Sequence, residues 1–256
     1  MRRVHIKHDV GDVNCQQAWR NLKAGWSELG TMTDELELKP NGTMRVIYGK
    51  GGDTGNLCKP PVAGGYLGAE NQAIRVQIVS FNPATKSGTF TWGFDNASPL
   101  YRVEIKTEGG LRRVVKMHSA PKDPAHWPLA NQVVEILPWS ALVPNRIGAS
   151  GYWQNCEKIA GRAGHLAIVE TSYSPDDGTF KLVPADKLPP TFGEGWKTWP
   201  ANTDFEPATE VFFFMRIWNR GIPDPQVQKK IAFNLDTPVA IGNTGLSALF
   251  TGHQFI

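Results

Sequence analysis

Most of the chain alternates between apolar and polar positions with a period of two, which is the pattern of half-buried β-strands. In Gln72–Val79, for example, Ile74, Val76 and Ile78 fall on one face, and Arg75 and Gln77 fall on the other. The same pattern predicts strands over Thr43–Gly49, Gln72–Val79, Thr89–Asn96, Lys229–Leu235 and Pro238–Gly252. Asn131–Pro144 is interpreted as a further strand and its exit.

Two segments read as complete β-hairpins. Leu100–Met117 holds two alternating strands around Glu108–Gly110, and Ala163–Ala185 turns at Pro175–Gly178. Glu210–Gly221 is an uninterrupted apolar run, which predicts a buried strand. Short strands at this density, joined by turns, predict a mainly β fold with long loops: an antiparallel sandwich or an open barrel with many hairpins.

One segment near the N-terminus has helical spacing instead. Cys15–Leu29 places Trp19, Leu22, Trp26 and Leu29 at steps of three or four residues, and Gly30 follows. We therefore expect one short N-terminal helix whose apolar stripe packs against the core.

The 256 residues suffice for a single β-rich domain over residues 1–256. The segment 186–208 contains four prolines and shows little periodicity, so we expect a long loop there. If the chain is subdivided, this loop is the predicted boundary, between 1–185 and 209–256.

Composition excludes several classes of protein. The net charge of +3 gives no electrostatic reason to bind nucleic acid or an anionic membrane, and Val211–Met215 is too short to span a bilayer. The basic start is not followed by the apolar run of a signal peptide. Cys15, Cys58 and Cys156 form no CxxC pair, so we predict no metal site and no cofactor. Three reduced, buried thiols are favoured over a disulfide between Cys15 and Cys58.

Polar side chains cluster just before one strand and at the end of another. Glu70 and Asn71 precede the strand that contains Arg75, and Asp95 and Asn96 end the strand Thr89–Asn96. Glu70 and Asp95 are a conceivable carboxylate pair for glycoside hydrolysis. The favoured interpretation is a structural polar clasp, in which Arg75 pairs with Asp95 or Glu70.

Trp196 and Trp199 lie in the proline-rich loop. Exposed indole rings there can stack on a glycan or anchor a protein partner, and simple packing of the loop onto the domain is the alternative.

The segment with the clasp also carries a family resemblance. "GGYLGAENQAIRVQI" followed by "GTFTWGFDNAS" resembles the signature G-Y-x-G-x-E-N-Q-x-x-R-V-E-I, then T-F-K-W-S-R-D-N, of a bacterial family of large proteins. "VEILPWSALVPN" and the C-terminal region are also similar, so the resemblance runs from about Cys15 to near the end. That family is associated with phage tails and with phage-tail-like contractile injection systems.

The resemblance implies a structural or adhesive part without catalytic residues, which binds other tail or baseplate subunits and forms a homo-oligomer. It also implies a virion or extracellular particle that is assembled in the bacterial cytoplasm. Thr91, Gly93 and Phe94 replace the Lys, Ser and Arg of the family signature, which leaves Arg75 as the partner for the carboxylates. The chain is expected to be a compact version of the family or one piece of a larger assembly protein.

The sequence therefore predicts a non-enzymatic structural or attachment module that acts through protein–protein interfaces. The alternative is a carbohydrate-active protein, either a glycan-binding module or a glycosidase. An assembly module should have a closed hydrogen-bond network and an exposed apolar patch. A glycosidase should have a tryptophan-lined cleft with two facing carboxylates.

Overall fold

A computed structural model describes residues 31–32, 38–39, 42–48, 73–94, 99–143, 146–147, 153–154, 157–193, 212–221, 223–242 and 244–252. The fold of these residues is mainly β, as the sequence predicts, and every strand pairing in them with a defined register is antiparallel. They contain no α-helix and only two 3-10 turns, η1 (Pro124–His126) and η2 (Pro184–Asp186). The expected helix over Cys15–Leu29 lies outside the described residues and is not borne out.

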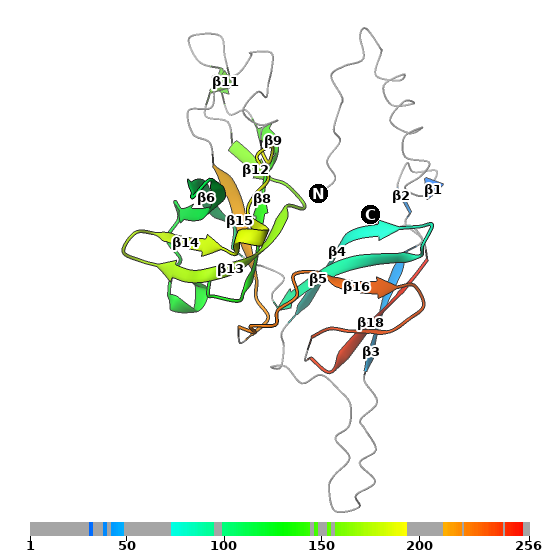
Figure 1. Cartoon of the computed structure of the whole chain (residues 1–256). Coiled ribbons are helices and arrows are strands. Elements are labelled where there is room, and N and C mark those ends of the chain that lie inside the picture. The colour runs from blue at the N-terminus through cyan, green and yellow to red at the C-terminus, as the bar shows by residue number, and fades with distance from the viewer. Residues whose placement is uncertain are drawn as a thin grey trace, which may run out of the picture. The chain divides into compact units, whose positions relative to one another are not determined.

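The chain forms two compact units, which are described separately below (Figure 1). Among the described residues, one unit takes in Ser80–Thr89, the three N-terminal strands and the chain from Ala232 onward. The other takes in the described residues of Ala69–Val79 and of Phe90–Ile231. The described part of the expected loop 186–208 and the described residues on either side of it therefore belong to this second unit, which we call the barrel unit.

The barrel unit contains a closed six-stranded barrel, whereas the sequence suggested a sandwich or an open barrel. Its strands follow the order β13-β14-β7-β6-β15-β8 around the wall (Figure 1). Because β15 returns to lie beside β8, the last four strands of the barrel along the chain, β8, β13, β14 and β15, form a Greek key. The strands are β6 (Tyr101–Glu108), β7 (Leu111–Met117), β8 (Val133–Leu137), β13 (His165–Ser174), β14 (Thr179–Leu182) and β15 (Phe213–Trp218).

Both predicted hairpins are confirmed. Strands β6 and β7 pair around Gly109 and Gly110, whose φ angles of 55° and 78° require the conformational freedom of glycine. Strands β13 and β14 pair across the second predicted turn.

The barrel interior is a continuous apolar core to which all six strands contribute. Strand β8 is buried on its outer side as well, so all five of its residues are inaccessible to solvent. This burial on both faces explains why its sequence shows no clean alternation. Smaller antiparallel pairs complete the described strands of this unit: β9 (Trp139–Val143) with β12 (Glu157–Ala160), and β10 (Arg146–Ile147) with β11 (Trp153–Gln154).

The other unit, the sandwich unit, is built around two three-stranded sheets, β16-β5-β4 and β17-β18-β3. The rings of Phe233 on β16 and Phe250 on β18 join the sheets, with centroids 4.2 Å apart. Strands β4 and β5 each belong partly to one unit and partly to the other. The strands are β1 (Thr31–Met32), β2 (Leu38–Lys39), β3 (Thr43–Tyr48), β4 (Ile74–Asn82), β5 (Ser87–Phe94), β16 (Ile231–Asn234), β17 (Val239–Ala240) and β18 (Leu246–Thr251).

Candidate functional site

Most of the site residues expected from the sequence lie outside the described residues. They are Glu70, Asn71, Asp95, Asn96, Trp196 and Trp199, together with Cys15, Cys58 and Cys156. Arg75 is the expected site residue that the structure describes. Its pairing with Asp95 or Glu70 stays a prediction.

Arg75 lies on the part of β4 that belongs to the barrel unit, and it is half-buried. Its guanidinium carbon is 4.8 Å from the centroid of the Trp218 ring, a cation–π contact. Its Nη2 also donates to Oε1 of Gln77, at 3.3 Å. The polar face of β4 that the sequence predicts is therefore packed against the barrel wall.

The same wall contains a buried carboxylate that the sequence interpretation missed. Glu135 on β8 is 0% exposed, and each of its oxygens accepts a hydrogen bond. Oε2 accepts from Nε of Arg216, at 2.7 Å, and from Nε1 of Trp218, at 2.9 Å. Oε1 accepts from the backbone N–H of Gly164, at 2.7 Å. Only glycine fits there, because a Cβ on residue 164 would lie 2.0 Å from a β8 carbonyl oxygen.

Arg216 on β15 links Glu135 to β4. It is 8% exposed, and its Nη2 donates to Oε1 of Gln77, at 2.9 Å, and to the carbonyl oxygen of Arg162, at 3.0 Å. Gln77 thus accepts hydrogen bonds from two arginines. We call Glu135, Arg216, Trp218, Gln77 and Arg75 the wall network. Such buried ions are tolerated only when they are paired and hydrogen-bonded.

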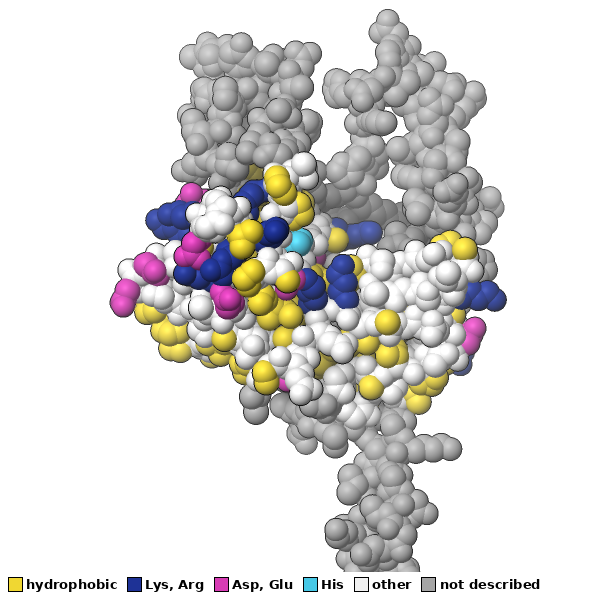
Figure 2. All heavy atoms as spheres, in the orientation of Figure 1, with side chains coloured by type: hydrophobic (Ala, Val, Ile, Leu, Met, Phe, Trp, Pro, Cys, Tyr) yellow, Lys and Arg dark blue, Asp and Glu magenta, His cyan; other side chains and the backbone are white. Residues whose placement is uncertain are grey.

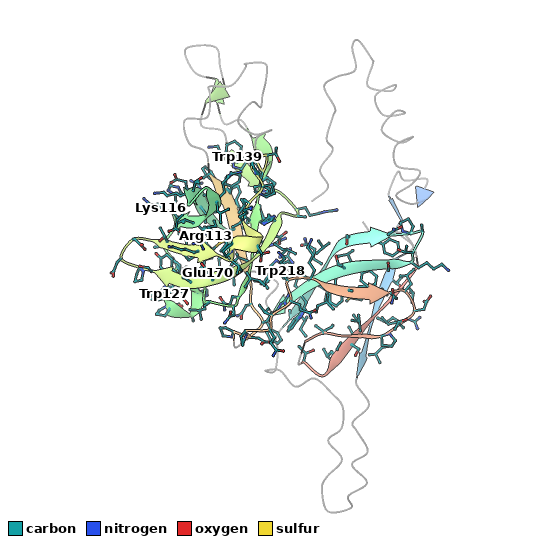
Figure 3. The ribbon with its side chains drawn as sticks, viewed as in Figure 1. Arg113, Lys116, Trp127, Trp139, Glu170 and Trp218 are labelled. Carbon is teal, nitrogen blue, oxygen red and sulfur yellow. The ribbon has the colours of Figure 1, made fainter. Side chains whose placement is uncertain are left out.

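The Glu135–Arg216 pair of the wall network lies between two apolar clusters on the outside of the barrel. Glu135 and Arg216 are direct cross-strand partners, and the flanking pairs on the same face are apolar: Leu137 with Phe214, and Val133 with Trp218. Trp139 and Trp218, which are labelled in Figure 3, belong to the two clusters on either side of the Glu135–Arg216 pair. The sequence contains a signal for this ion pair, because β8 and β15 each carry a single charge in an apolar run and the two charges are opposite.

A second arginine fixes β5 to the end of β15. Nη2 of Arg220 donates to the buried Thr91 hydroxyl, at 3.0 Å, and Nε donates to the carbonyl oxygen of Trp92, at 2.9 Å. Burial lowers the pKa of Arg220 to about 10. Gly93 permits this close approach, since a Cβ there would lie 2.9 Å from the carbonyl oxygen of Asn219. Thr91 and Gly93 are thus both part of the contact between β5 and the end of β15.

A second buried carboxylate joins η2 to β13. Oδ2 of Asp186 accepts from the backbone N–H of Ile168, at 2.9 Å, and Oδ1 accepts from Lys229. The carbonyl oxygen of Asp186 accepts from Nε2 of His165, at 2.9 Å. Burial, together with the charges of Lys229 and Lys230, lowers the pKa of His165.

The start of the loop 186–208 is fixed to the barrel as well. Nη1 of Arg112 on β7 donates to the carbonyl oxygens of Pro189, Pro190 and Phe192, at 2.6, 3.0 and 3.3 Å. Leu188 is buried in the barrel core. Residues 188–192 therefore pack onto the barrel, although the sequence of the loop shows no periodic pattern.

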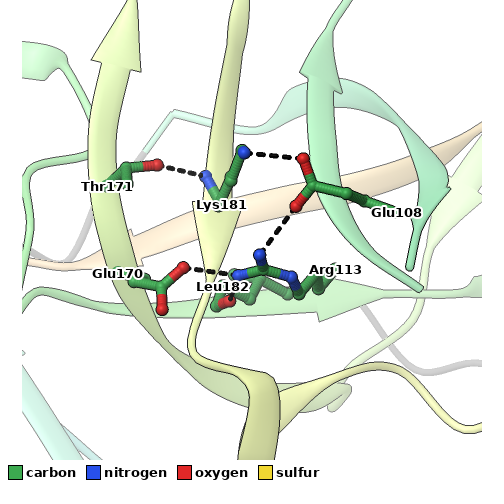
Figure 4. Close-up of polar contacts among 6 residues, drawn as sticks. All are labelled: Glu108, Arg113, Glu170, Thr171, Lys181 and Leu182. Carbon is green, nitrogen blue, oxygen red and sulfur yellow. Dashed lines mark hydrogen bonds and ion pairs between the residues drawn. The ribbon is translucent and has the colours of Figure 1, made fainter. Parts of the chain in front are cut away.

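The outer face of the barrel carries a set of exposed ion pairs (Figure 4). Arg113 bridges Glu108, at 2.7 Å, and Glu170, and Lys181 reaches the other oxygen of Glu108 at 2.6 Å. The hydrogen bond from Lys181, followed by the charges of Lys181 and Arg113, lowers the pKa of Glu108. Figure 2 shows basic and acidic side chains interspersed on this unit rather than gathered into a patch of one sign. This mixture is typical of a solvated face.

Among the described residues of the sandwich unit, the large apolar side chains that are exposed lie on β3. Met44 is 44% exposed and Val46 is 49% exposed, and they share one face of the strand. Their cross-strand partners on β18 are Phe250 and Ala248, which are buried in the sandwich core. The apolar inner face of this sheet is therefore buried at β18 and exposed at β3.

Across the part of the chain that the structure describes, no three His, Cys, Asp or Glu side chains are placed to hold a metal ion. None of the helical segments described is long and apolar enough to cross a membrane. Comparison of the chain with protein-family models, curated proteins and solved structures finds no match.

Proposed function

We propose that this chain is a non-enzymatic structural or attachment module of a phage tail or a tail-like contractile particle. It acts through protein–protein interfaces, in a homo-oligomer and with other tail or baseplate subunits. The kind of particle rests on the sequence resemblance, whose signature covers Gly64–Ile78 and Gly88–Ser98.

The observation that carries the interface is the apolar surface of β3, where Met44 and Val46 continue the inner face of a sandwich into solvent. An apolar surface that continues from a core is typical of a site where another protein packs. A solvated edge strand would carry polar side chains at these positions.

The buried carboxylates support a structural role over the carbohydrate-active alternative. A general acid or nucleophile must present an oxygen to the substrate. Both oxygens of Glu135 are occupied by donors from the chain itself, and so are both oxygens of Asp186. These two side chains are the buried acids of the described residues.

Sedimentation velocity of the full chain over two decades of concentration tests this proposal. Self-association above the 28.2 kDa monomer is expected. Release of reducing ends from a panel of bacterial and plant polysaccharides is measured in parallel, and none is expected. A monomer at every concentration, or turnover of any polysaccharide, would contradict the proposal.

A further inference from the structure

Strand β3 is a regular edge strand. Among the described strands it pairs with β18 alone, in an unbroken register from Thr43↔Thr251 to Tyr48↔Leu246. It contains no proline and no β-bulge, the usual devices by which edge strands avoid pairing with another chain. Its other edge therefore presents a regular row of backbone N–H and C=O groups.

The side chains of β3 specify what kind of strand would fit beside it. Met44 and Val46 point to the inner face, so an added strand needs apolar side chains on that face. Arg45 points to the opposite face, where it is exposed, and no ion pair among the described residues involves it. A carboxylate on the added strand would lie beside this guanidinium.

We propose that β3 accepts an extended segment of a neighbouring subunit as a further strand of its sheet. The segment alternates apolar residues, which pack on Met44 and Val46, with acidic residues, one of which pairs with Arg45. Backbone hydrogen bonds supply affinity in this mode of binding, and the alternating side chains supply specificity. The inference deepens the proposed function and rests on it, because it names the surface and the chemistry of the partner.

The test uses the full-length chain and two synthetic peptides that carry fluorescein on the N-terminal amine, fluorescein-TVEVEVT-NH2 and its charge-reversed counterpart fluorescein-TVKVKVT-NH2. By fluorescence anisotropy, the acidic peptide should bind more tightly than the basic one by about three- to tenfold, the size of cross-strand charge effects. Arg45→Glu should reverse this preference. Backbone amides of β3 should exchange more slowly with deuterium when the acidic peptide is bound.

Two lysine substitutions distinguish peptide binding at the edge of β3 from binding to any exposed apolar surface. Val46→Lys should weaken binding of the acidic peptide by about tenfold or more, because it places a charge in the apolar contact. Leu100→Lys is the matched control, since Leu100 is 51% exposed in the barrel unit, and it should leave binding unchanged. Circular dichroism melts confirm that the variants are folded. Arg45→Glu tests the charge preference independently of Val46.

The outcomes distinguish the inference from the proposed function. The inference is overturned if neither peptide binds, or if Arg45→Glu leaves the preference between the two peptides unchanged. This holds even where the full chain self-associates. If the acidic peptide binds with the expected charge preference while the chain stays monomeric, the inference holds, and the proposed homo-oligomer fails.

Discussion

The wall network makes the sharpest prediction about stability. Glu135→Gln keeps the shape of the side chain but removes the charge that faces Arg216. It also replaces one acceptor oxygen by an amide group that donates, in a place where three donors converge. Arg216 then remains a buried cation without its carboxylate.

The expected loss is large because both partners are buried, Glu135 completely and Arg216 to all but 8%. Removing one member of a buried ion pair costs about 3–5 kcal/mol of the free energy of unfolding. For a domain the size of the barrel unit, this lowers Tm by roughly 6–20 °C. Arg216→Gln should cost a similar amount, and the double variant should cost at least about 1 kcal/mol less than the sum, because the two side chains act as a pair.

Urea melts of the wild type, both single variants and the double variant measure these differences. Amide exchange at Gly164 is a local readout, because its N–H donates to Glu135, and it should speed up in Glu135→Gln. A loss below about 1 kcal/mol for either single variant, or additive losses in the cycle, would refute the argument that this pair holds β8, β15 and β4 together.

Three further predictions concern titration and catalysis. Because the pKa of His165 is lowered in the folded state, the unfolded chain binds this proton more tightly. The free energy of unfolding should therefore be level above the ordinary histidine pKa of about 6.5 and should fall as the pH drops below it. His165→Gln should flatten that fall in urea melts, and an unchanged slope would contradict it. Arg113→Gln should raise the pKa of Glu108 in an NMR titration, since it removes one of its two cations, and this rise should shrink in high salt. Glu70→Gln and Asp95→Asn should change no rate of polysaccharide hydrolysis, and lost turnover in either variant would favour the glycosidase.

The strands and both hairpins could be predicted because their signals are local. Alternation identifies β4, β5, β6 and β7. The glycines at 109 and 110 identify the turn between β6 and β7. Closure of the barrel could not be predicted, because it depends on pairings between strands far apart along the chain, such as β15 with β8. Alternation within one strand does not identify its partner.

The wall network was missed because its charges lie in strands that are buried on both faces. A lone Glu135 in "VVEIL" and a lone Arg216 in "FFFMRIW" gave no alternation, yet two opposite charges in two apolar runs indicate facing partners. The contacts of Arg75 with Trp218 and Gln77 were not predicted either, and its pairing with Asp95 or Glu70 stays a prediction. Packing of β4 on the barrel wall is a tertiary contact without a sequence motif.

Sedimentation velocity of the wild type beside Val46→Lys tests the central claim most directly, with Leu100→Lys as the control. If the chain is an assembly module that uses the edge of β3, the wild type and Leu100→Lys self-associate with the same concentration dependence, and Val46→Lys stays at the 28.2 kDa monomer. A wild-type chain that is monomeric at every concentration, or three chains that associate alike, would contradict the account.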